Sequence, residues 1–209
     1  MTNNNHSVVG PDKALNLLRD GNRRFVTGRM AHRDNFSRRR AELTGGQAPY
    51  ASILCCSDSR VPPEIVFDEG LGKLFITRVA GNVLTQELLA SLEYAALHST
   101  SRLIVVLGHE CCGAVTSAVH TLEQNAAVDT PHLQCLLDHI FPIVKDMQTE
   151  TRLDGQPFID LCAEENARRT AARIVAESAA LRDLVTGGEI KIVPAMYSLA
   201  DGGVTFLEA

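Results

Sequence analysis

The 209-residue sequence lacks three features that would place it in a broad protein class. It has no apolar run near the roughly 20 residues that a helix needs to cross a bilayer, so no membrane-spanning segment is expected. The only dense basic run, HRDNFSRRR at 32–40, has no interleaved aromatic residues, so no nucleic-acid partner is expected. The polar opening, MTNNNHSVVGPDKA, has no hydrophobic segment of a secretory signal. The lack of an export signal, together with six cysteines, predicts a cytoplasmic protein.

Internal repeats and low-complexity segments are also missing. The chain carries a net charge of −5, and 45% of its residues are hydrophobic, enough for a sizeable core. We therefore expect a flexible tail over residues 1–10 and a single domain over residues 11–209.

What the sequence does contain is an unusual placement of cysteine. Four of the six cysteines lie in two short runs, CCSDSR at 55–60 and GHECCGA at 108–114. Because no export signal is present, the thiols are expected to be reduced, and a disulfide framework is not expected.

The apolar pattern alternates between short buried runs and helical stripes. It predicts strands at 50–55, 73–79, 102–108, 189–197 and 204–208. It predicts helices at 11–27, 86–98, 132–148 and 160–180, with loops at 44–49 and 149–158. Strands that alternate with helices indicate an α/β fold, with a mostly parallel central sheet flanked by helices. We expect the last strand to be an antiparallel edge strand and the first helix to form an N-terminal helical arm.

Both cysteine runs follow a predicted strand. In open parallel sheets, ligands bind at the carboxyl ends of the strands, so the two runs are expected to meet at one site. Thiolates, imidazole nitrogens and carboxylates are the ligands that zinc takes in proteins. Cys56, His109 and Cys112, with Asp58 near a fourth position, therefore predict a catalytic zinc with one exchangeable place.

Arg60 lies two residues after Asp58 and can form a bidentate pair with its carboxylate. While that pair holds, Asp58 stays ionised and away from zinc, and water can take the fourth position. When the pair breaks, Asp58 can become the fourth ligand in a closed state. The sequence thus predicts an on/off switch within six residues.

The other cysteines and histidines have a plain structural interpretation. Cys55 should point into the sheet packing, opposite to Cys56, because successive side chains of a strand alternate. Cys111 lies in a turn and can be exposed. The rest are expected to be ordinary core or surface residues, and they are Cys135, Cys162, His6, His32, His120, His132 and His139.

Three motifs in this order resemble the β-class carbonic anhydrases: CSDSR at 56–60, RVAGN at 78–82 and GHECCG at 108–113. The segments LRDGNRRFVTG and VPAMYSLADGGVTFL are similar to the N-terminal helix and the C-terminal strand pair of that family. The resemblance extends over residues 11–208.

The resemblance implies one Zn²⁺ per chain and the reversible hydration of carbon dioxide to bicarbonate and a proton. The zinc ligands would be Cys56, His109 and Cys112. Asp58 and Arg60 would be the catalytic acid–arginine pair.

The resemblance also implies the substrate-binding residues of a homodimer or higher oligomer. Gly81 would offer a backbone amide near the substrate, and Gln47 would reach into the partner subunit's site. Phe75 and Tyr94 match the pocket aromatics of the plant-like branch, while Ala80 stands where that branch often has valine.

Two further positions bear on this reaction, the first through the same comparison and the second because hydration releases a proton that must leave the site. Ile53 stands where the other branch has a tryptophan of an inhibitory bicarbonate site, so that site is not expected here. His98, beside Tyr94, is a candidate proton shuttle.

Two alternative functions stay open at this point. One is the hydrolysis of carbonyl sulfide or carbon disulfide on the same scaffold, because these substrates are also linear and apolar. The other is a non-catalytic zinc or thiol sensor that uses the vicinal cysteines, although such a protein would need neither Asp58 nor Arg60.

Overall fold

The computed structural model describes residues 8–31 and 36–208. Its five-stranded sheet has the order β2-β1-β3-β4-β5. The strands are β1 (Ala51–Cys55), β2 (Leu74–Arg78), β3 (Leu103–His109), β4 (Lys191–Tyr197) and β5 (Val204–Phe206). All five predicted strands are present, and their ends differ from the prediction by at most two residues.

The pairing of the strands matches the predicted sheet. β1 pairs in parallel with both β2 and β3, and β3 pairs in parallel with β4. β5 runs antiparallel to β4 at the edge of the sheet, with Tyr197 opposite Val204. Each residue of β3 is buried, as expected of a strand covered on both faces.

The helices occupy both faces and one end of the sheet. They are α1 (Pro11–Val26), α2 (Phe36–Glu42), α3 (Pro63–Val66), α4 (Gln86–His98), α5 (Gly113–Glu123), α6 (Pro131–Leu137), α7 (Phe141–Glu150), α8 (Gly155–Glu177) and α9 (Ala179–Thr186). Two short 3₁₀ turns are η1 (Leu43–Gly45) and η2 (Ala80–Asn82). The predicted helices at 11–27 and 86–98 are confirmed as α1 and α4.

The helix predicted at 132–148 is wrong in one respect, because it is two helices. α6 ends at Leu137, and α7 begins at Phe141 with Pro142 in its first turn. Proline has no N–H and clashes with the preceding turn, so it starts a new helix rather than continuing the old one. The apolar stripe continues across the break, because both helices bury their apolar side chains in the same cluster.

The loop predicted at 149–158 and the helix predicted at 160–180 also need correction. α8 begins at Gly155, because Phe158 and Ile159 are buried and belong to its packed face. It ends at Glu177, and Ser178 caps α9 by accepting a hydrogen bond from Leu181 N–H at 3.1 Å. The sequence pattern did not predict α2 as a helix.

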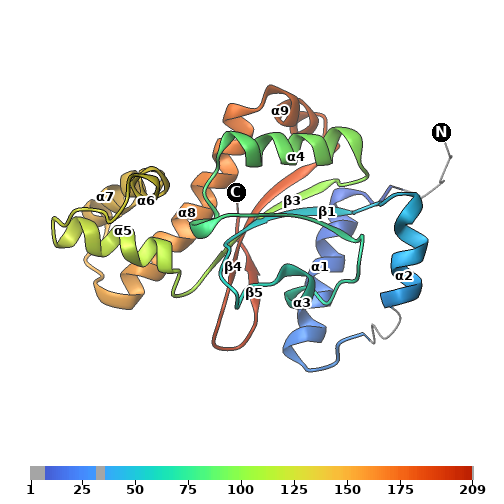
Figure 1. The fold of residues 1–209 in the computed structure, drawn as a ribbon, viewed down its shortest axis with the longest axis horizontal. Helices are drawn as coiled ribbons and strands as arrows, with labels where there is room; N and C mark the ends of the chain where they lie inside the picture. The colour runs from blue at the N-terminus through green and yellow to red at the C-terminus, as the bar shows by residue number, and fades with distance from the viewer. Residues whose placement is uncertain (1–7, 32–35, 209) are drawn as a thin grey trace.

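The helices pack against the sheet in three groups, each with its own cluster of buried side chains. α1 and α3 lie on one face, where Leu18 packs in a cluster with Ile53 and Cys55. α4, α8 and α9 lie on the other face, in a cluster that contains Leu54. α5, α6 and α7 gather beyond the strand ends, at the left in Figure 1. Cys112 belongs to this third cluster, so the layout brings it to the carboxyl edge of the sheet.

Residues 1–7, most of the predicted tail, and residues 32–35, the start of the basic run, lie outside the described residues, and so do His6 and His32. Among residues 8–31 and 36–208, no helix is long and apolar enough to span a membrane.

Candidate metal centre

Three side chains with metal-ligating atoms meet at the carboxyl edge of the sheet. Cys56 follows β1, His109 ends β3, and Cys112 directly precedes α5. Their ligand atoms all lie within 4.8 Å of one another, and all three residues are buried. Because β1 and β3 are parallel neighbours, their carboxyl ends point to the same edge. The fold therefore brings together the two half-sites that the sequence placed after separate strands.

The imidazole of His109 has one ring nitrogen engaged and one free. Nδ1 donates to the backbone carbonyl of Glu110 at 2.8 Å, which assigns the proton to Nδ1. Nε2 is buried and has no hydrogen-bond partner among the described residues. A metal-ligating histidine uses its second nitrogen in this way to fix the tautomer and the ring orientation. The geometry leaves an unpaired lone pair that suits a metal ion.

The two thiols of the cluster shift each other's pKa in opposite directions. A hydrogen bond from the Cys112 thiol lowers the pKa of Cys56, and contact with His109 lowers it further. The pKa of Cys112 is raised because its proton is held by Cys56 and because the group is buried. A divalent cation would supply the positive charge that allows both groups to be thiolates. Two sulfurs and one imidazole nitrogen fit zinc.

Asp58 and Arg60 form the bidentate pair that the sequence predicts. Arg60 Nε donates to Asp58 Oδ1 at 2.9 Å, and its Nη2 donates to Oδ2 at 2.7 Å. The backbone N–H of Arg60 adds a third bond to Oδ1 at 2.8 Å. This guanidinium holds the pKa of the Asp58 carboxyl well below its usual range. Asp58 is not one of the three residues that form the ligand cluster.

Gly81 lies directly beside the cluster. Its backbone N–H donates to Cys56 Sγ at 3.3 Å, and its φ of 69° is in the left-handed region that favours glycine. A Cβ at this position would approach Ile140 Cδ1 to 2.9 Å and Ala114 Cβ to 3.0 Å. Ala80, its neighbour in η2, is partly buried.

Phe75 and Tyr94 lie together at the edge of the sheet. Their ring centroids are 6.4 Å apart, and the Tyr94 ring is 5.3 Å from that of His98. Tyr94 is 57% exposed, so this aromatic row lies at the surface of the single chain. No ring contact or hydrogen bond among the described residues links the row to Cys56, His109 or Cys112.

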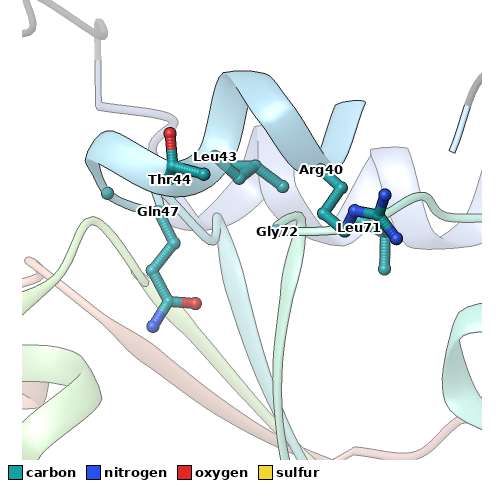
Figure 2. Close-up of a pocket in the computed structure, with 7 residues that line it drawn as sticks. Arg40, Leu43, Thr44, Gln47, Leu71 and Gly72 are labelled. Atoms are coloured by element: carbon teal, nitrogen blue, oxygen red, sulfur yellow. The ribbon is translucent and has the colours of Figure 1, made fainter. Parts of the chain in front are cut away.

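Gln47 is exposed and lies in another region of the surface. It lines a pocket of about 520 Å³ formed by η1, the end of α2 and the loop at Leu71 and Gly72. Figure 2 shows its side chain extending away from the other labelled residues of this pocket. The pocket includes none of the three residues of the ligand cluster. Within one chain, Gln47 therefore does not join the ligand cluster.

The cysteines outside the cluster lie as expected. All six cysteines are free. Cys55 is fully buried on the α1 face of the sheet, opposite to Cys56, and Cys111 is exposed. Cys135 is exposed on α6, and Cys162 is buried on α8.

Polar side chains that brace the ligand loops were missed by the sequence reasoning. Arg78 donates to the backbone carbonyls of Cys56 at 3.0 Å and Asp58 at 2.6 Å. Asp160 on α8 accepts from the N–H of Cys111 at 2.8 Å. Arg78 is the first residue of the RVAGN motif, so that motif could have identified it as a residue of the site. No pattern separates Asp160 from the solvent-facing polar residues of its helix.

A mostly parallel α/β sheet with a buried Cys–His–Cys cluster at its carboxyl edge defines a metal-binding α/β protein. The sequence matches the family described as "Carbonic anhydrase" over residues 51–204. "Carbonic anhydrase 2" of Mycobacterium tuberculosis is 38% identical over 194 residues, which cover 93% of this chain and 91% of that protein. "Carbonic anhydrase" of Mycolicibacterium smegmatis is 37% identical, with coverages of 93% and 92%.

Solved structures give the same result for the fold. The β-carbonic anhydrase CcaA superposes with a TM-score of 0.72 at 25% identity, over 93% of this chain and 95% of that one. A tetrameric β-carbonic anhydrase from Sordaria macrospora gives 0.73 at 21% identity, over 81% and 86%. The chain belongs to the carbonic anhydrase family, and its fold is that of the β class.

Proposed function

We propose that this protein catalyses the reversible hydration of carbon dioxide to bicarbonate and a proton. The observation that carries the proposal is the buried cluster of Cys56, His109 and Cys112, with the free Nε2 of His109, in a chain of this family. Its relatives are named carbonic anhydrases. They give no support to hydrolysis of carbonyl sulfide or carbon disulfide, or to a non-catalytic zinc or thiol sensor.

The cofactor in this proposal is one Zn²⁺ per chain. Cys56 Sγ, His109 Nε2 and Cys112 Sγ would hold it. Bound zinc lowers the pKa of water and so supplies a nucleophile for carbon dioxide near neutral pH. Residues 11–209 would act as one zinc domain, and six free thiols suit a reducing cytoplasm.

Asp58 and Arg60 are the proposed catalytic pair. The two side-chain bonds from Arg60 keep the Asp58 carboxylate ionised and fix the direction of its oxygens. An ionised carboxylate only accepts hydrogen bonds, so Asp58 can hold the hydroxyl of the attacking group and orient its lone pair toward carbon dioxide. Asp58 would become a fourth zinc ligand only when it leaves Arg60.

The substrate pocket of this proposal is built by two copies of the chain. Gly81 and Ala80 would line it beside the ligand cluster, and Gln47 would enter from the other copy. Phe75 and Tyr94 would be its aromatic residues, in the pattern of the plant-like branch. The exposure of Tyr94 and Gln47 in the single chain supports this arrangement, because a partner would cover both. We propose a homodimer or a higher homo-oligomer, and one related structure is described as tetrameric. His98, next to Tyr94, stays a candidate proton shuttle.

Stopped-flow measurement of carbon dioxide hydration by zinc-loaded protein tests this function. The wild type should hydrate carbon dioxide and hold about one zinc per chain by elemental analysis. Cys56→Ser, His109→Ala and Cys112→Ser should each lose zinc and activity, because each removes one of only three protein ligands. A wild type that binds zinc and hydrolyses carbonyl sulfide but does not hydrate carbon dioxide would contradict the proposal.

The matched controls are the neighbouring cysteines. Cys55→Ser and Cys111→Ser remove a thiol one position away from a proposed ligand and should keep most of the zinc. If Cys111→Ser empties the site and Cys112→Ser does not, the assignment of the ligands within HECC is wrong.

A further inference from the structure

The backbone at Gly81 is held from two sides. Its N–H donates to Cys56 Sγ at 3.3 Å, and its carbonyl accepts from Asn166 Nδ2 at 2.7 Å. Asn166 lies on α8, 85 residues further along the chain, and is 1% exposed. One glycine therefore connects a proposed metal ligand to a buried carboxamide in another element.

The orientation of the peptide group at Gly81 depends on such a restraint more than it would at a residue with a side chain. Glycine populates positive and negative φ about equally, so its own backbone preference does not hold the N–H toward Cys56. Ile140 and Ala114 close the space above its Cα, but apolar contacts do not fix the rotation of a peptide group. A hydrogen bond to the carbonyl does fix that rotation, because it acts on an atom off the chain axis.

The placement of Asn166 also calls for a reason beyond packing. Its neighbours on the same helix, Ala163, Ala167 and Thr170, are buried with it. A buried carboxamide is costly unless it is hydrogen-bonded, and a leucine of similar size would pack there without that cost. The bond to Gly81 is the one hydrogen bond that the Asn166 side chain makes among the described residues.

We infer that Asn166 is a positioning residue for the metal centre, which it serves by holding the Gly81 peptide so that its N–H stays aimed at Cys56 Sγ. An N–H directed at a thiolate stabilises the negative charge on sulfur and fixes the direction of its lone pairs. The inference rests on the proposed function, since it takes Cys56 to be a metal ligand.

The test compares Asn166→Leu with Thr170→Val. Thr170 lies one turn further along α8, is 2% exposed and lines the same small pocket as Asn166, but it makes no bond to Gly81. Both variants remove a buried polar group of α8 and keep the branching and the number of side-chain heavy atoms. Only the first removes the restraint on Gly81.

Two readouts other than catalysis separate positioning from general stability. Zinc affinity, measured by competition with a chelator, should fall about ten-fold in Asn166→Leu and stay unchanged in Thr170→Val. In the cobalt-substituted proteins, the thiolate-to-cobalt charge-transfer band of Asn166→Leu should move to longer wavelength. A thiolate that has lost its hydrogen bond gives up an electron more easily, whereas general destabilisation would not move this band.

The possible outcomes separate a failure of this inference from a failure of the proposed function on which it rests. If the wild type binds no zinc and does not hydrate carbon dioxide, both are overturned. If the wild type is an active zinc enzyme and folded Asn166→Leu has the wild-type affinity and band, the inference alone is overturned. Should Asn166→Leu not fold, wild-type protein loaded with cadmium-113 gives the answer. A coupling between the metal and the Gly81 amide proton, and slow exchange of the Asn166 carboxamide protons, are expected, and the absence of either overturns the inference.

Discussion

At the scale of single residues, the pair of Asp58 and Arg60 has the clearest chemical consequence. Three hydrogen bonds from Arg60 engage both carboxylate oxygens, and two of them come from the guanidinium. Asp58 is half-buried, whereas Arg60 is exposed. The cation is thus the partner that solvent can reach, and Asp58 is the partner that would be left beside the metal.

Arg60→Ala tests this pair. Asp58 loses two of its three bonds to Arg60 and should turn to the metal as a fourth ligand, so the protein should keep about one zinc per chain and lose nearly all hydration activity. Asp58→Ala is the matched variant, in which activity falls but no carboxylate closes the site. X-ray absorption at the zinc edge separates the two states. An Arg60→Ala protein with normal activity and an exchangeable water would rule out the gating role.

The buried thiol of Cys55 leads to a prediction about the stability of the protein at alkaline pH. Burial raises the pKa of its thiol to about 12, above the ordinary value of 9.0. A raised folded-state pKa gives stability that is fully present below pH 9 and is lost as the pH rises toward 12. The free energy of unfolding should therefore fall across this window by up to about 1.4 kcal/mol per pH unit. Cys55→Ser should show a shallower slope in urea titrations across the same pH window, and a slope equal to that of the wild type would contradict the prediction.

The candidate site was largely predictable from sequence because its residues lie in short local motifs. Cys56 and His109 each follow an apolar run, and the rule for strand ends is enough to bring them together. The role of Asn166 was not predictable, because its bond to Gly81 joins residues 85 positions apart. A contact of this kind produces no repeating pattern in the sequence. Gln47 stays a prediction, because its proposed place is in another copy of the chain.

At the scale of elements, strands were easier to predict than helix ends. β3 is apolar throughout because both of its faces are covered, so its pattern is unambiguous. The stripe from Leu133 to Met147 is also correct as a buried face, but it does not reveal the turn between α6 and α7. Pro142 indicates a helix start at that turn. The prediction overlooked it because the apolar residues keep a helical spacing across the turn.

The docking of α1 depends on Asn22. Its Nδ2 donates to the carbonyls of Val66 at 3.1 Å and Gly202 at 2.8 Å, and its Oδ1 accepts from Val204 N–H at 2.9 Å. Asn22→Leu leaves these backbone groups unpaired and should lower the free energy of unfolding by about 3 kcal/mol, at roughly 1 kcal/mol per bond.

A control on the same helix makes this measurement specific. Asn16 is exposed, so Asn16→Leu should change stability by less than about 0.5 kcal/mol in the same urea titration. Equal losses in the two variants would mean that the bonds of Asn22 do not anchor the helix.

At the scale of the whole molecule, the single chain leaves its β2 edge open. β2 is the outer strand of the sheet, and among the described residues no strand pairs with its free side. Phe75 on this strand continues into the exposed row of Tyr94 and His98. A surface of this kind suits the second copy that we propose, because pairing or covering removes the hazard of an exposed strand edge.

Mixing two inactive variants tests whether Gln47 acts in the partner's site. Gln47→Ala and Cys56→Ser should each have little activity alone. In a mixed dimer, one site receives both lesions and the other receives neither, so random reassociation of equal amounts should restore about a quarter of the wild-type sites. Hydration activity should appear only after the subunits have been exchanged. No recovery in verified mixed dimers would place Gln47 outside the partner's site.

The contacts that α8 makes with the ligand loops also have a consequence for how the enzyme is made. Cys56, His109 and Cys112 leave the ribosome before α8, whose Asp160 and Asn166 hold Cys111 and Gly81. At about 5–20 residues per second, the roughly 50 residues between Cys112 and Asn166 take several seconds to synthesise. During that interval the nascent chain carries the cysteines that we propose as metal ligands without these supporting contacts. We therefore expect the proposed metal centre to be completed only near the end of translation. A chain truncated before α8 should bind metal more weakly, although it would contain all three proposed ligands.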